Sequence, residues 1–188
     1  MLKISRNSDN RANKCVAHRV ADIAGGVGVR TSNLGGKVLY EGTPLAKGEN
    51  GIYEVVKTAK LVTDANSQAT KLEIAKGSHF VVGDYIGFSS AVKGVQITAI
   101  DKSNASKDVL TVASIAAELK AGAVGVETTS TTTYNPKLTA VAVAGSNNDV
   151  VAGEICYTDA WVIAVVNESN APAVNDSIKS ANPAIRYV

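Results

Sequence analysis

The sequence predicts a mainly β protein built of small antiparallel barrel or sandwich units, with an extended N-terminal arm and one or two short helices. Short runs of alternating or β-branched residues recur at a spacing of roughly ten residues, separated by Gly, Asn, Asp and Ser, as in small barrels and sandwiches. Hydrophobic residues make up 45% of the chain but aromatic residues only 5%. Because the core must therefore consist of Ala, Val, Ile and Leu, thin β layers are favoured over a deep pocket lined with rings.

Residues 1–37 are predicted to form the N-terminal arm. Residues 1–30 hold six basic and two acidic side chains, a local charge of +4, whereas the whole chain carries +2. The partner of this arm is expected to be acidic. Residues 14–24 fit either a short amphipathic turn or a strand, and the arm is expected to become ordered against a partner.

Residues 38–63 are predicted to be a β-hairpin region. A short strand at 38–41 is followed by turns at 42–44 and 47–51 and by a β-rich run over 52–63. Glycine and asparagine at 48–51 supply the positive φ angles that a tight turn needs.

Residues 64–127 are predicted to form a compact barrel or sandwich, exposed as a knob. Strands are expected at 71–74, 85–88, 94–101 and 108–112. A helical turn is expected at 114–120, because Ile115, Ala116 and Leu119 have helical spacing and Gly122 can end a helix.

Residues 128–136 are predicted to be a Thr-rich linker, either extended or an exposed edge strand, because six hydroxyl residues precede Tyr134. Residues 137–188 are predicted to be a C-terminal β unit that contributes the oligomer interface. It contains apolar runs at 138–144 and 153–166, a segment at 174–181 suited to a short helix, and an apolar end at 184–188. Such an end is expected to lie in a sheet or against a neighbouring subunit.

The two cysteines, Cys15 and Cys156, lie far apart and outside any CxxC motif. Two buried thiols in a reducing cell are favoured over a disulfide. No transmembrane segment or signal-peptide core is recognised, so synthesis in a cytoplasm is expected.

The side chains able to carry chemistry are few, and no catalytic, metal-binding or cofactor-binding residue is predicted. The histidines are His18 and His79, and a metal site needs three or four converging ligands. Asp84 follows Gly83 between two strands, where aspartate usually accepts hydrogen bonds from turn amides.

Three further motifs favour structural roles. The glycines of residues 24–28 complete neither a dinucleotide fingerprint nor a P-loop. Ser89 and Ser90 lack a GxSxG elbow and are interpreted as turn residues. Trp161, with its apolar neighbours, is interpreted as a core or subunit-interface residue rather than a sugar-stacking platform.

Several segments from residue 38 to the C-terminus resemble the head fibre or head decoration proteins of tailed bacteriophages, especially the crAss-like phages of gut Bacteroidales. The segments that carry the resemblance are residues 42–48, 53–59, 76–84, 97–101, 108–112, 165–169 and 185–188. The resemblance implies a non-enzymatic virion protein, displayed as an oligomer on the outer capsid surface. No long repetitive shaft follows the central unit, which favours a compact decoration protein or fibre base.

The expected partners are the major capsid protein and other copies of the chain, as a homotrimer, with residues 1–37 as the anchor. Contact of the displayed protein with a carbohydrate or a host surface is left open. Nucleic acid is not an expected partner, because a net charge of +2 is low for an electrostatic nucleic-acid binder. A membrane is not expected either, because no transmembrane segment is recognised. One alternative is a carbohydrate-binding or adhesin module of a tail or baseplate, with His79, Tyr85 or Trp161 on the sugar. A hydrolase with a non-standard site is the other alternative, which the scarcity of histidine disfavours.

Overall fold

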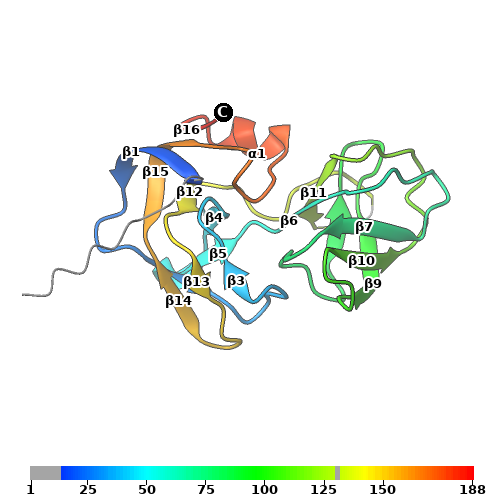
Figure 1. Ribbon diagram of the computed structural model, residues 1–188, viewed down its shortest axis with the longest axis horizontal. Coiled ribbons are helices and arrows are strands. Elements are labelled where there is room, and N and C mark those ends of the chain that lie inside the picture. The colour runs from blue at the N-terminus through cyan, green and yellow to red at the C-terminus, as the bar shows by residue number, and fades with distance from the viewer. Residues whose placement is uncertain (1–13, 130–131) are drawn as a thin grey trace, which may run out of the picture.

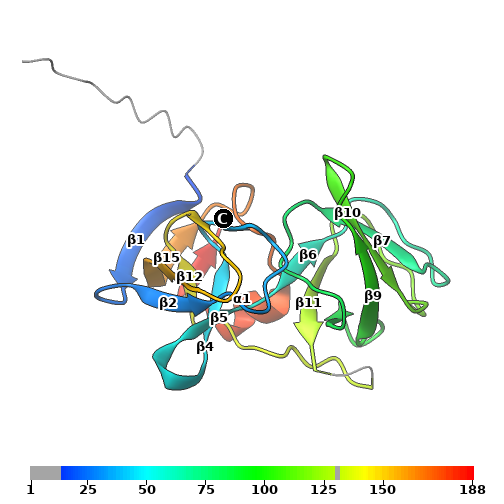
Figure 2. The same cartoon turned by 90° about the horizontal axis from the view of Figure 1, so that it is seen from below.

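The chain folds into two β lobes that lie side by side (Figures 1 and 2). The computed structural model describes residues 14–129 and 132–188. Residues 14–57 and 132–188 together build one lobe, here called the terminal barrel. Residues 58–129 build the other, here called the inserted barrel. The mainly β class expected from the sequence is confirmed.

The terminal barrel closes because two of its strands follow one another almost without a break. Its strands are β1 (Val16–Asp22), β2 (Val27–Arg30), β4 (Pro44–Lys47), β5 (Tyr53–Val55), β12 (Ala142–Ala144), β14 (Ile155–Thr158), β15 (Ala160–Val166) and β16 (Ile185–Tyr187). They pair in the order β1-β15-β12-β4-β5-β2-β14, with β16 also on β15. Asp159 alone separates β14 from β15, so the last strand of this order runs directly into the second and closes the ring.

Three small elements complete the terminal barrel. Strands β3 (Val38–Leu39) and β13 (Asn148–Asp149) form a separate two-stranded sheet, and a 3₁₀ turn η1 spans Glu49–Gly51. Helix α1 (Asp176–Ala181) lies within the segment expected to be helical. Asn175 caps it, since its side chain accepts a hydrogen bond from the Ile178 amide.

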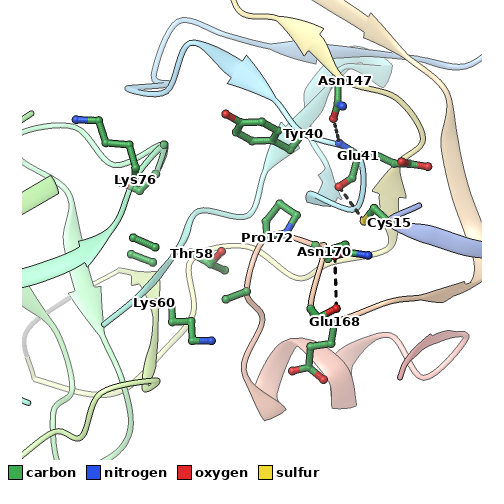
Figure 3. Close-up of a pocket in the computed structure, with 17 residues that line it drawn as sticks. Cys15, Tyr40, Glu41, Thr58, Lys60, Lys76, Asn147, Glu168, Asn170 and Pro172 are labelled. Atoms are coloured by element: carbon green, nitrogen blue, oxygen red, sulfur yellow. Dashed lines mark hydrogen bonds between the residues drawn. The ribbon is translucent and has the colours of Figure 1, made fainter. Parts of the chain in front are cut away.

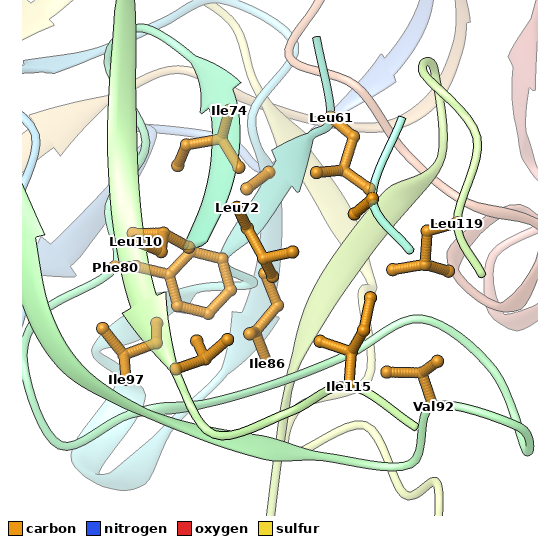
Figure 4. Close-up of a cluster of buried hydrophobic side chains, with 13 residues drawn as sticks. Leu61, Leu72, Ile74, Phe80, Ile86, Val92, Ile97, Leu110, Ile115 and Leu119 are labelled. Carbon is orange, nitrogen blue, oxygen red and sulfur yellow. The ribbon is translucent and has the colours of Figure 1, made fainter. Parts of the chain in front are cut away.

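The inserted barrel is antiparallel throughout. Its strands are β6 (Thr58–Lys60), β7 (Lys71–Ala75), β8 (Tyr85–Gly87), β9 (Val95–Asp101), β10 (Lys107–Val112) and β11 (Val124–Thr128), paired in the order β6-β11-β8-β9-β10-β7. A bridge between Leu61 and Ile74 joins the two outer strands and closes the barrel. Inside it, one cluster of buried apolar side chains surrounds Phe80 (Figure 4).

The described part of the predicted arm, residues 14–37, differs from expectation because it contains two barrel strands. β1 pairs with β15 and β2 pairs with β14, both antiparallel. Val16, Val27 and Val29 are buried among residues from the other end of the chain. Residues 1–13 of the predicted arm lie outside the described residues.

The structure also divides the rest of the chain differently from the predicted segments. The run over 52–63 holds two strands, β5 in the terminal barrel and β6 in the inserted barrel, so the crossing falls at Val56 and Lys57. No helix forms at 114–120. Ala116 has a φ of 61°, and its amide donates to the Ser67 carbonyl oxygen rather than to a helical turn.

Candidate functional site

A cleft of about 470 Å³ lies between the two barrels (Figure 3). Its walls come from both lobes and combine polar, apolar and charged side chains. The lining residues are Cys15, Tyr40, Glu41, Thr58, Ala59, Lys60, Ala75, Lys76, Gly77, Ser78, Asn147, Glu168, Ser169, Asn170, Ala171, Pro172 and Ala173. Its volume lies within the range of small-ligand sites.

The wall from the inserted barrel consists of β6 and of the residues around the end of β7. β6 pairs with β11 along one edge, and its connection to β7 on the other side is the bridge at Leu61. Thr58–Lys60 and residues 75–78 therefore border the cleft together, on adjacent strands. Ser78 is only 8% exposed, and its hydroxyl has no hydrogen-bond partner among the described residues.

The wall from the terminal barrel is held together by hydrogen bonds around Glu41. The Glu41 amide donates to Asn147 Oδ1 at 2.7 Å, and the Cys15 thiol donates to the Glu41 carbonyl at 3.0 Å. The Glu41 carboxylate lies 3.2 Å from Arg19. These contacts fix the position of the neighbouring Tyr40, which is 44% exposed.

The thiol at the cleft is a poor candidate for a nucleophile. Burial, together with the Glu41 carboxylate, raises the pKa of Cys15 to about 12, and the reactive form of cysteine is the thiolate. Cys156 is also a free, buried thiol, and burial raises its pKa as well. Both cysteines therefore have the buried, unbridged state expected from the sequence.

A second cavity, of about 40 Å³, lies next to the cleft and shares Tyr40, Thr58 and Ser78 with it. His79 lines this small cavity and is 6% exposed. Its burial, followed by the nearby charges of Lys57 and Lys102, lowers the pKa of the imidazole to about 4. The ring is therefore neutral at pH 7. The Val38 backbone lies close enough to raise the pKa a little, but neither ring nitrogen has a partner in good hydrogen-bond geometry among the described residues.

A buried ionic cluster lies where the chain crosses between the barrels. Lys57 Nζ is 2.7 Å from Asp84 Oδ2 and 3.8 Å from Glu127 Oε2, and Lys137 Nζ is 2.6 Å from Glu127 Oε1. Asp84 Oδ2 also accepts the Val81 amide at 2.9 Å, the turn role expected for it. The cluster ties both crossing segments, at Lys57 and Lys137, to the inserted barrel.

The sequence reasoning missed Lys57 and Glu127 because they are seventy residues apart along the chain. A signal was nevertheless present. Lys57 interrupts an apolar run after Val55 and Val56, and Glu127 follows Val126 in a strand. A charged residue inside an apolar strand is rarely buried without a partner.

The residues considered as sugar contacts are not brought together. His79 is buried and Tyr85 is partly buried on β8, both in the inserted barrel. Trp161 is partly buried on β15 of the terminal barrel, with the Arg19 guanidinium 5.3 Å from its ring centroid. The interpretation of Trp161 as a core or interface residue fits this position.

The other motifs from the sequence lie in turns and on an edge strand. Gly25 and Gly26 have positive φ in the turn between β1 and β2. The Ser89 hydroxyl accepts the Ala91 amide in a surface turn, and His18 is exposed on β1.

No known protein family, curated protein or solved structure matches this chain. Within residues 14–129 and 132–188 we find no group of three or more side chains placed to hold a metal ion. The same residues contain no helix long and apolar enough to cross a membrane.

Proposed function

We propose that this chain is a non-enzymatic structural protein of a tailed-phage virion, a decoration protein or fibre base on the outer capsid surface. In this proposal it is made in the cytoplasm of the host bacterium. It then binds the major capsid protein and other copies of itself. The resemblance of residues 42–48, 76–84 and 185–188 to head fibre and decoration proteins supports the proposal. So does the division into two small barrels, one of which can bind the shell while the other projects.

The observation that carries the proposal is the exposed apolar surface of the terminal barrel. Val20 on β1 is 59% exposed, and Ile163 on the paired strand β15 is 43% exposed. These two apolar side chains lie on paired strands next to the sheet edge at β1, and they are suited to burial against another subunit.

The location is tested by labelling purified virions that contain the chain with a gold-conjugated antibody raised against it. Label on the capsid surface is the expected result. Label confined to the tail or baseplate, or its absence from intact virions, would contradict the proposal.

The homotrimer is tested by light scattering on the purified protein at micromolar concentration. We expect a trimer for the native chain and dissociation on Val20→Lys, because the new charge would be buried at the interface. The matched control is Val82→Lys, on an exposed residue of the inserted barrel, which should remain trimeric. A native monomer would refute the trimer.

The anchoring role is tested by removing residues 1–13 only. A longer deletion, through residue 30, would also remove β1 and β2 and open the terminal barrel. The shortened chain is expected to stay folded and to lose capsid attachment. Normal decoration by this variant would exclude an anchoring role for residues 1–13.

A further inference from the structure

We propose that the cleft between the two barrels binds a neutral saccharide, with the Tyr40 ring against a sugar face and the Ser78 hydroxyl on a sugar hydroxyl. The cleft of about 470 Å³ lies at a boundary between two lobes, a common place for ligand sites. This proposal is independent of capsid attachment and concerns a different part of the molecule from the apolar surface around Val20.

The charges around the cleft favour a neutral ligand. Three charged side chains of its walls form ion pairs with residues outside it: Glu41 with Arg19, Lys76 with Asp108, and Glu168 with Lys179. An ionic ligand would have to compete with these pairs. Lys60 also borders the cleft, but it is exposed to solvent, where its charge is largely screened.

The polar groups at the inner end of the cleft suit a hydroxyl. Ser78 Oγ is buried without a partner, and His79 in the adjoining cavity is neutral at pH 7. A hydroxyl and a neutral imidazole can each donate and accept a hydrogen bond. The adjoining cavity of about 40 Å³ has room for one water molecule, which a sugar hydroxyl can replace.

Tyr40 provides the aromatic surface that a sugar ring needs. It is 44% exposed, and Figure 3 shows it on the wall opposite Thr58. Gly77 lies beside the ring, and a Cβ there would be 3.4 Å from Tyr40 Cε2. A side chain at position 77 would therefore contact the edge of the ring, and glycine leaves that contact out. An aromatic ring with a hydroxyl combines an apolar face with a polar end, which matches the two kinds of surface on a sugar.

The test is a titration of the full-length, ¹⁵N-labelled protein, followed by amide chemical shifts. The probes are the methyl glycosides of glucose, galactose, mannose and N-acetylglucosamine. At least one is expected to shift the amides of Tyr40, Thr58 and Ser78, with a Kd of about 1 mM. If none of the four shifts these amides up to about 20 mM, the proposal is overturned.

Three variants then separate this cleft from other exposed aromatic surface. Tyr40→Ala is expected to weaken binding at least about tenfold, and Ser78→Ala by roughly fivefold to tenfold. Tyr157→Ala, which removes an exposed tyrosine outside the cleft, should leave the affinity unchanged. Native affinity in a folded Tyr40→Ala protein, or shifts centred on Tyr157, would assign the binding elsewhere. Because the readout uses isolated protein, its result is separate from capsid attachment.

Discussion

The two barrels differ in how they are assembled from the chain. The inserted barrel is contiguous, over residues 58–129, and its strands pair with neighbours from the same segment. The terminal barrel pairs the two ends of the chain, as in the contact of Val16 with Val166. Local pairing loses less entropy on closure than distant pairing. The inserted barrel can therefore form before the terminal barrel is complete.

The two barrels also differ in the size of their hydrophobic cores. The inserted barrel has one cluster of thirteen buried side chains, with Phe80, Leu72 and Ile86 fully buried. The terminal barrel divides its buried apolar residues among smaller clusters, one of which also contains Val126 of the inserted barrel. Alanines such as Ala142 and Ala160 contribute little volume to them. The stability of the terminal barrel thus depends more on chain closure and edge contacts than on one large core.

The largest expected effect is on the core of the inserted barrel. Phe80→Ala should lower the free energy of unfolding by about 3–5 kcal/mol, because it leaves a cavity in a fully buried site. Urea unfolding followed by circular dichroism should show this loss. Fluorescence of Trp161, the single tryptophan and a residue of the terminal barrel, should change less. Val82→Ala is the exposed control. Equal shifts of both signals would mean that the barrels unfold as one unit.

The next effect is on the junction between the barrels. Lys57→Met should destabilise the protein by about 3–5 kcal/mol, because it leaves Asp84 and Glu127 without their buried cation. Lys120→Met is the matched control, because Lys120 and its partner Asp64 are both exposed. It is expected to destabilise the protein much less than Lys57→Met does. The free energy of unfolding is measured with urea. Similar losses for both variants would show that the burial of Lys57 does not determine the loss of stability.

The inserted barrel should also lose stability on acidification through His79. The pKa of His79 is about 4 in the folded chain, against about 6.5 unfolded. The unfolded state therefore binds the proton first. Stability is fully present above pH about 6.5 and falls as the pH drops toward 4, by about 3 kcal/mol at most. His79→Gln should remove this part of the pH dependence, and an unchanged slope between pH 4 and 6.5 would contradict the assignment.

The smallest effect tests the only capped α-helix of the described residues. Asn175→Ala removes the acceptor for the Ile178 amide and should cost about 1 kcal/mol. Trp161 fluorescence should detect this loss in the terminal barrel. Asn66→Ala removes an exposed turn contact in the inserted barrel and should leave the Trp161 transition unchanged. A larger shift of the Trp161 transition for Asn66→Ala than for Asn175→Ala would contradict this prediction.

The inserted barrel was more predictable from sequence than the terminal barrel. Alternation over residues 71–74, 94–101 and 108–112 predicted β7, β9 and β10, because each strand buries one face locally. The pairing of β1 and β2 with β15 and β14 could not be predicted, since nothing near Val16 or Val27 indicates partners at the far end of the chain. The prediction of a helical turn at 114–120 was wrong, because the Ala116 amide bonds to the distant Ser67 carbonyl and not within the local segment.

The candidate site was predictable only in its parts. Cys15 was expected to be a buried thiol and Asp84 a hydrogen-bond acceptor in a turn. Cys15 is a free, buried thiol, and Asp84 accepts the Val81 amide. Tyr40 and Ser78 carry no motif, and they meet only because the two barrels bring their segments together. A cleft between two lobes depends on their relative placement, which local sequence patterns do not encode.

The crossing between the barrels has a consequence for how such a chain can be altered. The strand that enters the inserted barrel, β6, pairs directly with the strand that leaves it, β11, and Thr58 faces Val126. Paired residues of an antiparallel ladder have Cα atoms about 5 Å apart. The terminal barrel is therefore interrupted at what amounts to a single point. A different module whose own ends meet at a similar distance could replace residues 58–129 if it also supplied an acidic partner for Lys57, or if Lys57 were changed with it. This junction is therefore a natural position for modular exchange and for grafting.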